Sequence, residues 1–322
     1  MPANFSRISA CLSLALLATV AGAEYPDRAV RFVVGFTPGG PSDIVARLLG
    51  HKLAEAWGQQ VVIDNRAGAG GNIAAELVAK SAGDGYTLLL GNNSILATNA
   101  ALYAKLNFDP VRDFAPVVLV ASQPNILVVH PSLPVKSVKE LIALAKAKPG
   151  QLNYASSGSG AAAHLSGELF KAMAHVDLVH IPYKGAAPAL NDVLAGQDQL
   201  MFATSLSVMP HIQSGRARAL AVTTPKRHWI MAELPTMAES GYPKIESTFW
   251  LGVVAPAGTP AAIVERLNAA FRESLAAPET RERLKALGAD AAIGTPEEFR
   301  LMLADELALW TSVAKAANLQ MD

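Results

Sequence analysis

The sequence predicts an α/β protein of two domains, and three observations lead to this fold class. The chain has 322 residues, which is enough for two domains of medium size. It is 51% hydrophobic and 17% charged, which is typical of a globular protein with a substantial core. Apolar strand-like runs also alternate with helical patterns along the whole chain. We therefore expect two sheets with helices packed against them.

Most of the expected strands are apolar throughout, which favours strands covered on both faces, as in parallel sheets. They lie at 30–34, 60–64, 86–91, 115–121, 125–130, 152–156, 176–182, 199–203, 218–223 and 249–255. We expect the chain to cross into the second domain within 115–134 and to return near 245–255. The mostly helical stretch that follows is expected to pack back onto the first domain.

The N-terminus has the pattern of a signal peptide. Arg7 supplies a positive charge, "CLSLALLATV" is an apolar run too short to span a bilayer, and "AGA" at 21–23 is a small-residue cleavage site. We expect cleavage after Ala23. A lipoprotein site at Cys11 is the alternative, but there the apolar run would have to precede the cysteine. Cys11 is the chain's single cysteine, so the mature protein is expected to have no disulfide, thiol nucleophile or cysteine metal site.

The charge balance argues against nucleic acid as a partner. Lys plus Arg and Asp plus Glu both number 27, so no general basic field attracts polyanions. The sequence also contains no later apolar stretch long enough for a membrane span. A small molecule or a protein is therefore the expected partner.

The segment "FTPGGPSDIVARLLG", residues 36–50, predicts an anion site without a cation. It follows the strand 30–34 and leads into a helix, and no basic side chain lies between Arg31 and Arg47. A helix start leaves about four N–H groups unpaired and carries about half a positive charge, and glycines let a ligand approach it. The expected donors are the amides of Thr37 and of Gly39 to Asp43, and Asp43 has the alternative role of capping the helix.

Three more donor-rich loops follow predicted strands. They contain Asn92, Asn93 and Ser94; then the run 156–160; and then the run 183–185, which precedes another helix. A single loop of this kind is ordinary between a strand and a helix. Ligands of open α/β sheets bind at the carboxyl ends of strands, so four such loops in two domains predict an interdomain cleft.

Motifs for other chemistry are weak or absent from the sequence. "GAGGNI" at 68–73 suggests a dinucleotide loop, but it lacks the third glycine and a suitably spaced acidic residue. There is no phosphate-binding P-loop, no G-x-S-x-G elbow and no H-E-x-x-H pair among the seven histidines. We therefore predict no catalytic residue, metal or cofactor. His164 has two open roles, ligand contact or helix surface, and Trp250 is either core or cleft wall.

These residues, in this order, resemble the periplasmic solute-binding proteins of tripartite tricarboxylate transporters, the TctC or Bug family. The resemblance covers essentially the whole mature chain. The segments that carry it, which are highly specific together, include "YPDRAVRFVVGFTPGGPSDIVARLL" at 25–49, "NYASSGSGAAAHLSGELF" at 153–170 and "VHIPYKGAAPALNDVLAGQ" at 179–197.

The resemblance implies a type 2 periplasmic-binding-protein architecture, with a hinge and an interdomain cleft that closes on a small carboxylate. Domain I would comprise 24–121 and 248–322, domain II 122–247, and the signal peptide 1–23. It further implies a periplasmic monomer whose partners are a carboxylate and the membrane permease subunits. Carried over by position, the ligand-binding residues would be Phe36, Thr37, Gly39, Gly40, Asp43, Asn92, Ser94, Ser156, Ser157, Gly158, Ser159, Gly160, His164, Tyr183, Lys184, Ala203 and Thr204.

Two positions depart from the family pattern. The family often has an acidic residue at the cleft after the "MF" of a late strand, whereas this chain has Ala203 followed by Thr204 and Ser205. A ligand amine would lose a natural partner there. Thr37 also offers a hydroxyl where the family usually has proline.

Three functions remain open at this stage. The first is a binding protein that delivers a carboxylate to a transporter, and the second is a sensor component that docks on a membrane receptor. The third is an exported hydrolase that uses a loop serine such as Ser157. The ligand could be a di- or tricarboxylate, an aromatic acid or an acidic amino acid.

Overall fold

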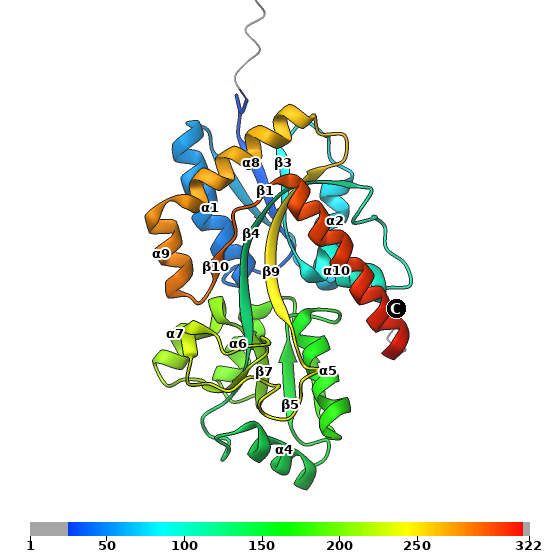
Figure 1. The fold of residues 1–322 in the computed structure, drawn as a ribbon, viewed down its shortest axis with the longest axis vertical. Coiled ribbons are helices and arrows are strands. Elements are labelled where there is room, and N and C mark those ends of the chain that lie inside the picture. Colours follow the sequence, from blue (N-terminus) through cyan, green and yellow to red (C-terminus); the bar gives the residue numbers. More distant parts are fainter. Residues whose placement is uncertain (1–24, 318–322) are drawn as a thin grey trace, which may run out of the picture.

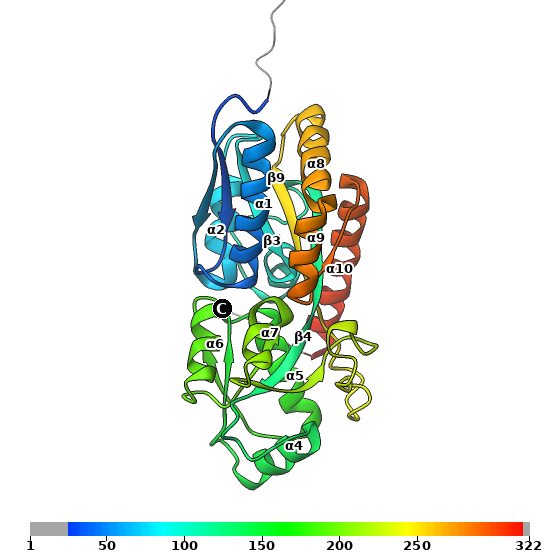
Figure 2. The ribbon, with the colours of Figure 1, turned by 90° about the vertical axis from the view of Figure 1, so that its left-hand side faces the viewer.

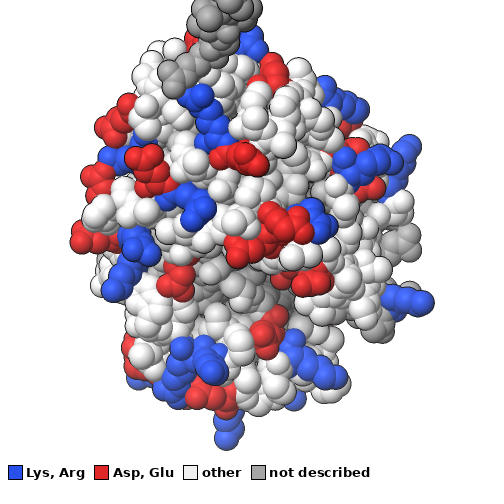
Figure 3. Space-filling model, turned by 45° about the horizontal axis from the view of Figure 1, so that its top comes forward, with Lys and Arg blue, Asp and Glu red and all other residues white. Residues whose placement is uncertain are grey.

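The computed structural model describes residues 25–317 and shows two α/β lobes stacked along the longest axis of the molecule (Figures 1 and 2). The predicted signal peptide and Cys11 lie outside the described residues. Within 25–317, no helix combines the length and the apolar character needed to cross a membrane. Lys and Arg side chains are interspersed with Asp and Glu over the face seen in Figure 3, in keeping with the balanced charge.

Lobe 1 is the upper lobe in Figure 1 and contains both ends of the described chain. Its strands are β1 (Val30–Val34), β2 (Val61–Asn65), β3 (Thr87–Asn92) and the short β10 (Asp290–Ala291). Its helices are α1 (Pro41–Trp57), α2 (Asn72–Ala79), α3 (Asn99–Leu102), α8 (Ala261–Ala276), α9 (Pro278–Ala286) and α10 (Pro296–Ala317), with short turns at Ala69–Gly71 and Ser94–Thr98.

Lobe 2 is the lower lobe in Figure 1, with α4 at its far end. Its strands are β5 (Asn153–Ser156), β6 (Val179–Pro182), β7 (Leu200–Thr204) and β8 (Arg218–Val222). Its helices are α4 (Val138–Ala147), α5 (Ala162–Ala174), α6 (Ala186–Leu194) and α7 (Ser205–Gln213), with a short turn at Trp229–Met231.

Two long strands, β4 (Phe114–Val129) and β9 (Thr248–Pro256), connect the lobes. The first part of β4 pairs with β9, and its last part, from Asn125, pairs with β7 and β8. The expectation of two strands at 115–121 and 125–130 was therefore wrong, because they form one. Pro124 does not break it because only β9 pairs at that position, so one edge of the strand is free of ladder bonds there.

The expectation of parallel sheets holds only in part. Strands β2, β1 and β3 are parallel, as are β6, β5 and β7, but β4 and β9 run antiparallel to all their partners. The apolar runs instead reflect cover on both faces of each sheet. Phe32 packs with α1, α8 and α9, whereas the next residue, Val33, packs with α2 and α10. In lobe 2, Leu127 faces α4 and α5, and Val128 faces α6 and α7.

The helical stretch after β9 packs on lobe 1, as the sequence indicates. Phe299 of α10 is 1% exposed, and its ring makes an edge contact of 5.9 Å between centroids with Trp250 of β9. Trp250 therefore belongs to the core. These contacts fix β9 to lobe 1 close to the point where the chain crosses between lobes.

Candidate functional site

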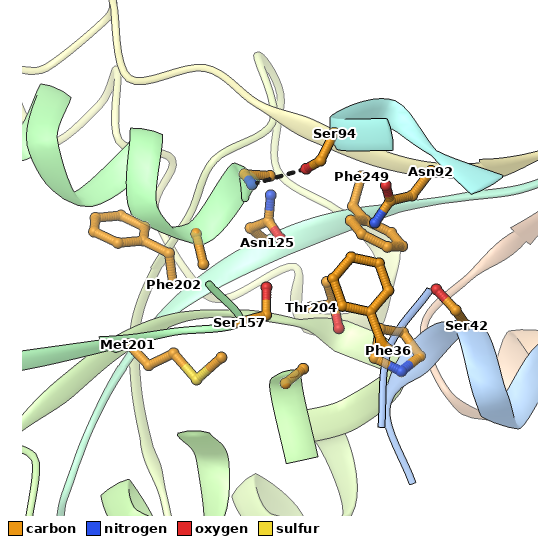
Figure 4. Close-up of a pocket in the computed structure, with 14 residues that line it drawn as sticks. Phe36, Ser42, Asn92, Ser94, Asn125, Ser157, Met201, Phe202, Thr204 and Phe249 are labelled. Atoms are coloured by element: carbon orange, nitrogen blue, oxygen red, sulfur yellow. Dashed lines mark hydrogen bonds between the residues drawn. The ribbon is translucent and has the colours of Figure 1, made fainter. Parts of the chain in front are cut away.

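A cavity with an empty volume of about 430 Å³ lies between the two lobes (Figure 4). We call it the inner cavity. Its lining residues are Phe36, Pro41, Ser42, Asn92, Ser94, Asn125, Ser157, Ala162, Ala163, Ala186, Met201, Phe202, Thr204 and Phe249. They come from strand ends and helix starts of both lobes and from the crossing strands β4 and β9.

Four helix starts converge on the inner cavity. The first residues of α1, α5 and α6, namely Pro41, Ala162 and Ala186, line it, as does Thr204, the N-cap of α7. None of these four N-caps has a side chain that accepts a hydrogen bond from a backbone amide of the helix that it precedes. Apart from the Ala162 amide, which donates to Ser94, their first-turn amides can offer donors and partial positive charge, although no charged side chain of the described residues lines the cavity. Such a site suits an anion.

The loop 36–40 supplies an aromatic wall and a close contact between lobes. The Phe36 side chain is 6% exposed and lines the inner cavity. Gly40 is the N-cap of α1, and Gly39 adopts a φ of +84°. The Thr37 Oγ1 atom is buried and has no hydrogen-bond partner among the described residues. Thr37, Gly39 and Gly40 lie in this loop without lining the cavity.

Asp43 takes the alternative role that the sequence offered. Its Oδ2 accepts a hydrogen bond from the Gly39 amide at 2.9 Å, and Arg47 lies one helical turn away at 2.9 Å from its Oδ1. Burial opposes ionisation of Asp43, but the hydrogen bonds from Arg47 and Gly39 outweigh it and hold its pKa below the usual value. Asp43 stabilises the start of α1 and does not line the cavity.

Asn92 and Ser94 line the cavity, as expected. The Asn92 Oδ1 accepts a hydrogen bond from the Ile95 amide at 3.0 Å, which leaves its Nδ2 pointing toward the cavity in Figure 4. The Ser94 Oγ accepts a hydrogen bond from the Ala162 amide at 3.2 Å. Because Ser94 belongs to lobe 1 and Ala162 to lobe 2, this bond joins the lobes across the site.

In the serine–glycine loop of lobe 2, residues 156–160, some residues line the inner cavity and others support the loop. Ser157 lines the inner cavity. Ser156 is fully buried, and its Oγ lies 2.6 Å from the Nε2 of His180 and accepts the Gly158 amide. The serine of this loop that lies beside a histidine is therefore the buried Ser156, not the cavity-lining Ser157.

Two histidines stack beneath this loop. The rings of His164 and His180 have centroids 4.1 Å apart, and Tyr154 stacks on the other face of His180 at 4.8 Å. The Gly160 amide donates to the Nδ1 of His164 at 3.2 Å. His164 therefore supports the loop through its hydrogen bond with Gly160. It does not line the cavity, so its role is neither of the two that the sequence left open, ligand contact or helix surface.

Burial favours the neutral form of both histidines. It lowers the pKa of His164, and it lowers the pKa of His180 to about 4, helped by repulsion from His164. Glu168 and Lys171 on α5 act in opposite directions on both rings. Neutral rings can accept hydrogen bonds from the loop, whereas two cations at this separation would repel each other.

We expect folding stability to fall between pH 6.5 and about 4 as a consequence. The unfolded chain binds a proton at His180 in this window and the folded chain does not, so protons favour unfolding. Thermal melting across this range should show a shallower pH slope in His180→Gln than in the parent protein. Replacing the exposed His51 by glutamine should leave the slope unchanged, and an equal slope in both variants would contradict the argument.

A second cavity, with an empty volume of about 570 Å³, adjoins the first through Phe36 and Ser157. We call it the outer cavity. It is lined by Phe36, Gly68, Ala69, Gly70, Gly71, Tyr103, Ser157, Gly158, Ser159, Pro182, Tyr183 and Lys184. The Tyr103 hydroxyl donates to the Ser159 carbonyl at 3.2 Å, another contact between lobes. The "GAGGNI" glycines thus face a loop of lobe 2.

The remaining expected residues lie apart from the inner cavity. The Tyr183 hydroxyl lies 2.6 and 2.7 Å from carboxylate oxygens of Asp192 and Asp198, so it points into lobe 2. Lys184 is exposed at the outer cavity. Ala203 is fully buried among apolar residues of lobe 2 and lines neither cavity, whereas its neighbour Thr204 lines the inner one.

Sequence reasoning missed most of the apolar wall. Met201, Phe202 and Phe249 line the inner cavity but sit in strands, where apolar residues are expected to be core. Asn125 was also missed, although an amide inside an otherwise apolar strand was a usable signal. Its Nδ2 donates to the Ser247 Oγ at 3.1 Å.

Two α/β lobes joined by crossing strands, with uncapped helix starts facing one cleft, define the class of two-lobed solute-binding proteins. The chain belongs to the tripartite tricarboxylate transporter family receptors, whose model matches residues 45–319. It is a solute-binding protein rather than an enzyme, and its fold matches that of solved periplasmic binding proteins.

Three similar proteins illustrate the relationship. A UPF0065 protein from the tcbD-tcbE intergenic region of Pseudomonas sp. strain P51 is 41% identical, covering 94% of this chain and 92% of its own. The structure of R. palustris Rpa4515 with adipate is 43% identical with a TM-score of 0.88, covering 92% and 99%. The periplasmic binding protein BugD is 36% identical with a TM-score of 0.89, covering 92% and 100%.

Proposed function

We propose that this protein captures a small carboxylate between its lobes and delivers it to the permease subunits of a tripartite tricarboxylate-type transporter. The observation that carries the proposal is the convergence of four helix starts, one from lobe 1 and three from lobe 2, on a cavity that no charged side chain of the described residues lines. The adipate in the similar Rpa4515 structure supports a carboxylate ligand.

The mechanism is a population shift toward the closed state. The cavity is lined from both lobes, so a ligand gains its full set of contacts only when the lobes close around it. A micromolar Kd corresponds to about −8 kcal/mol. Several hydrogen bonds to a charged ligand, at about 1.5–3 kcal/mol each, are sufficient for this.

The domain division and export route form part of the same proposal. Domain I would comprise 24–121 and 248–322, and domain II 122–247, consistent with the change of β4 partners near Asn125 and the start of β9 at Thr248. Residues 1–23 would direct a monomer to the periplasm and be removed. The contacting residues would be those that line the inner cavity, with the loops 36–40 and 156–160 positioning them.

A thermal-shift screen against a panel of carboxylates tests the proposal. An acid at 100 times its Kd adds about 2.7 kcal/mol to the free energy of unfolding, which raises the melting temperature by about 5 °C in a protein of this size. The corresponding primary alcohols serve as uncharged controls and should give no shift. If no acid in the panel raises the melting temperature, the proposal is wrong.

A further inference from the structure

Among the described residues, the lining of the inner cavity provides no charged partner for a ligand ammonium group. No acidic side chain lines it, and the nearby carboxylate of Asp43 is engaged with Arg47 and the Gly39 amide. Helix starts also present the positive ends of their dipoles to the same space. An α-amino group bound there would lose its hydration, face positive potential and meet no counter-charge.

Several polar side chains of the cavity already contact other protein groups. Ser94 accepts from an amide of lobe 2, the Asn125 amide donates to Ser247, and the Thr204 Oγ1 lies 3.1 Å from the Ser207 Oγ. The first-turn amides and a few remaining polar atoms can satisfy a carboxylate group. Additional ligand hydroxyls would compete for the same few donors and acceptors.

The rest of the wall is apolar. Phe36 and Phe249 are each 6% exposed, Met201 and Phe202 are 2% and 1% exposed, and all four residues line the cavity (Figure 4). Figure 4 shows the Phe36 and Phe249 rings in the same part of the cavity, with Met201 and Phe202 elsewhere on its wall. Burying an aromatic or methylene surface against such groups contributes about 25 cal/mol per Å² of apolar area.

We propose that the ligand is a carboxylic acid without an amino group whose body is apolar, either an aromatic ring or a chain of methylenes lying against Phe36 and Phe249. This rests on the proposed function and narrows it, because it excludes acidic amino acids and disfavours citrate-like hydroxy acids. The acid group meets the helix starts, and the apolar body fills the aromatic side of the cavity.

Calorimetric titration of the mature protein with matched pairs of acids tests this inference. The pairs are 3-phenylpropionate with phenylalanine, glutarate with glutamate, and succinate with malate. We expect the amine-free acid of each of the first two pairs to bind at least 100-fold more tightly, and succinate more tightly than malate. Equal or tighter binding of phenylalanine or glutamate would overturn the inference and leave carboxylate capture intact, whereas no binding by any acid would overturn both.

A pair of phenylalanine variants tests the role of the apolar wall. Phe36 and Phe108 are both 6% exposed and belong to the same apolar cluster, but Phe108 does not line the cavity. Phe36→Ala should weaken 3-phenylpropionate binding at least tenfold and acetate binding little, whereas Phe108→Ala should leave both unchanged at a similar loss of melting temperature. If both acids weaken equally in Phe36→Ala, the apolar body does not lie against Phe36.

Discussion

Replacing Gly185 by valine is expected to weaken ligand binding at least 100-fold. Gly185 is the N-cap of α6 in lobe 2, and it adopts a φ of +155°. A Cβ at this position would lie 2.3 Å from the Thr37 Oγ1 and 3.1 Å from the Thr37 backbone nitrogen, both in lobe 1. The added side chain would therefore hold the lobes apart and remove the contacts that depend on closure. A 100-fold change corresponds to about 2.8 kcal/mol.

The controls separate closure from backbone strain. Gly241 also has a positive φ, of +95°, and a Cβ there would meet no atom within 4 Å. Gly241→Val therefore reports strain alone and should bind normally. In a Gly185→Ala background, Thr37→Ala should restore part of the affinity because it removes the closest atom. Calorimetry gives the Kd, and small-angle scattering gives the contraction on binding. If Gly185→Val contracts on ligand binding as much as the parent protein does, Gly185 does not approach Thr37 when the lobes close.

The sequence anticipated the individual strands better than their pairing. The run 30–34 matches β1 because it is apolar and ends at a glycine turn. Pairing direction is a different matter: an apolar strand covered on both faces looks the same in parallel and antiparallel sheets. The break placed before Asn125 also failed, because the effect of Pro124 depends on which edges of β4 carry partners, and this is set by strands more than 70 residues away.

The sequence predicted lining residues of the inner cavity where they belong to glycine-rich loops and helix starts, and missed those that lie within packed strands. The glycine-rich loops indicate where helices start. Five of the residues expected from such patterns line the inner cavity, namely Phe36, Asn92, Ser94, Ser157 and Thr204. Loop residues that support others, such as Ser156 and His164, carry the same local pattern as contact residues. Only the position of His180, on the neighbouring strand, distinguishes them.

Asp43 shows that a local signal can be sufficient. Arg47 lies four residues later, which places both side chains on one helix face and predicts the ion pair. Phe249 is a residue for which the local sequence is not sufficient. It resembles the buried Trp250 beside it in sequence, yet it lines the cavity, because adjacent strand residues face opposite sides of the sheet.

Replacing Gly252 by alanine is expected to reduce the free energy of unfolding by about 3 kcal/mol, the upper end of the usual cost of overpacking. Gly252 lies in the middle of β9, paired with Gly91 on β3 and Leu119 on β4. A Cβ there would lie 2.1 Å from the Cζ of Phe299 on α10. Strands on both sides prevent the backbone from yielding, so α10 must move away from the sheet.

A double-mutant cycle measured by urea unfolding distinguishes this clash from a general loss of strand stability. Phe299→Leu removes the ring atoms nearest to position 252 and should cost about 1–2 kcal/mol alone, as a smaller apolar residue in a packed site. In that background Gly252→Ala should cost less than about 1 kcal/mol, giving a coupling of about 2 kcal/mol between the two positions. Additive costs would show that the glycine is required for the strand itself. A strong coupling would show that α10 packs directly on β9, so that α10 helps to hold the strand that returns from lobe 2 against lobe 1.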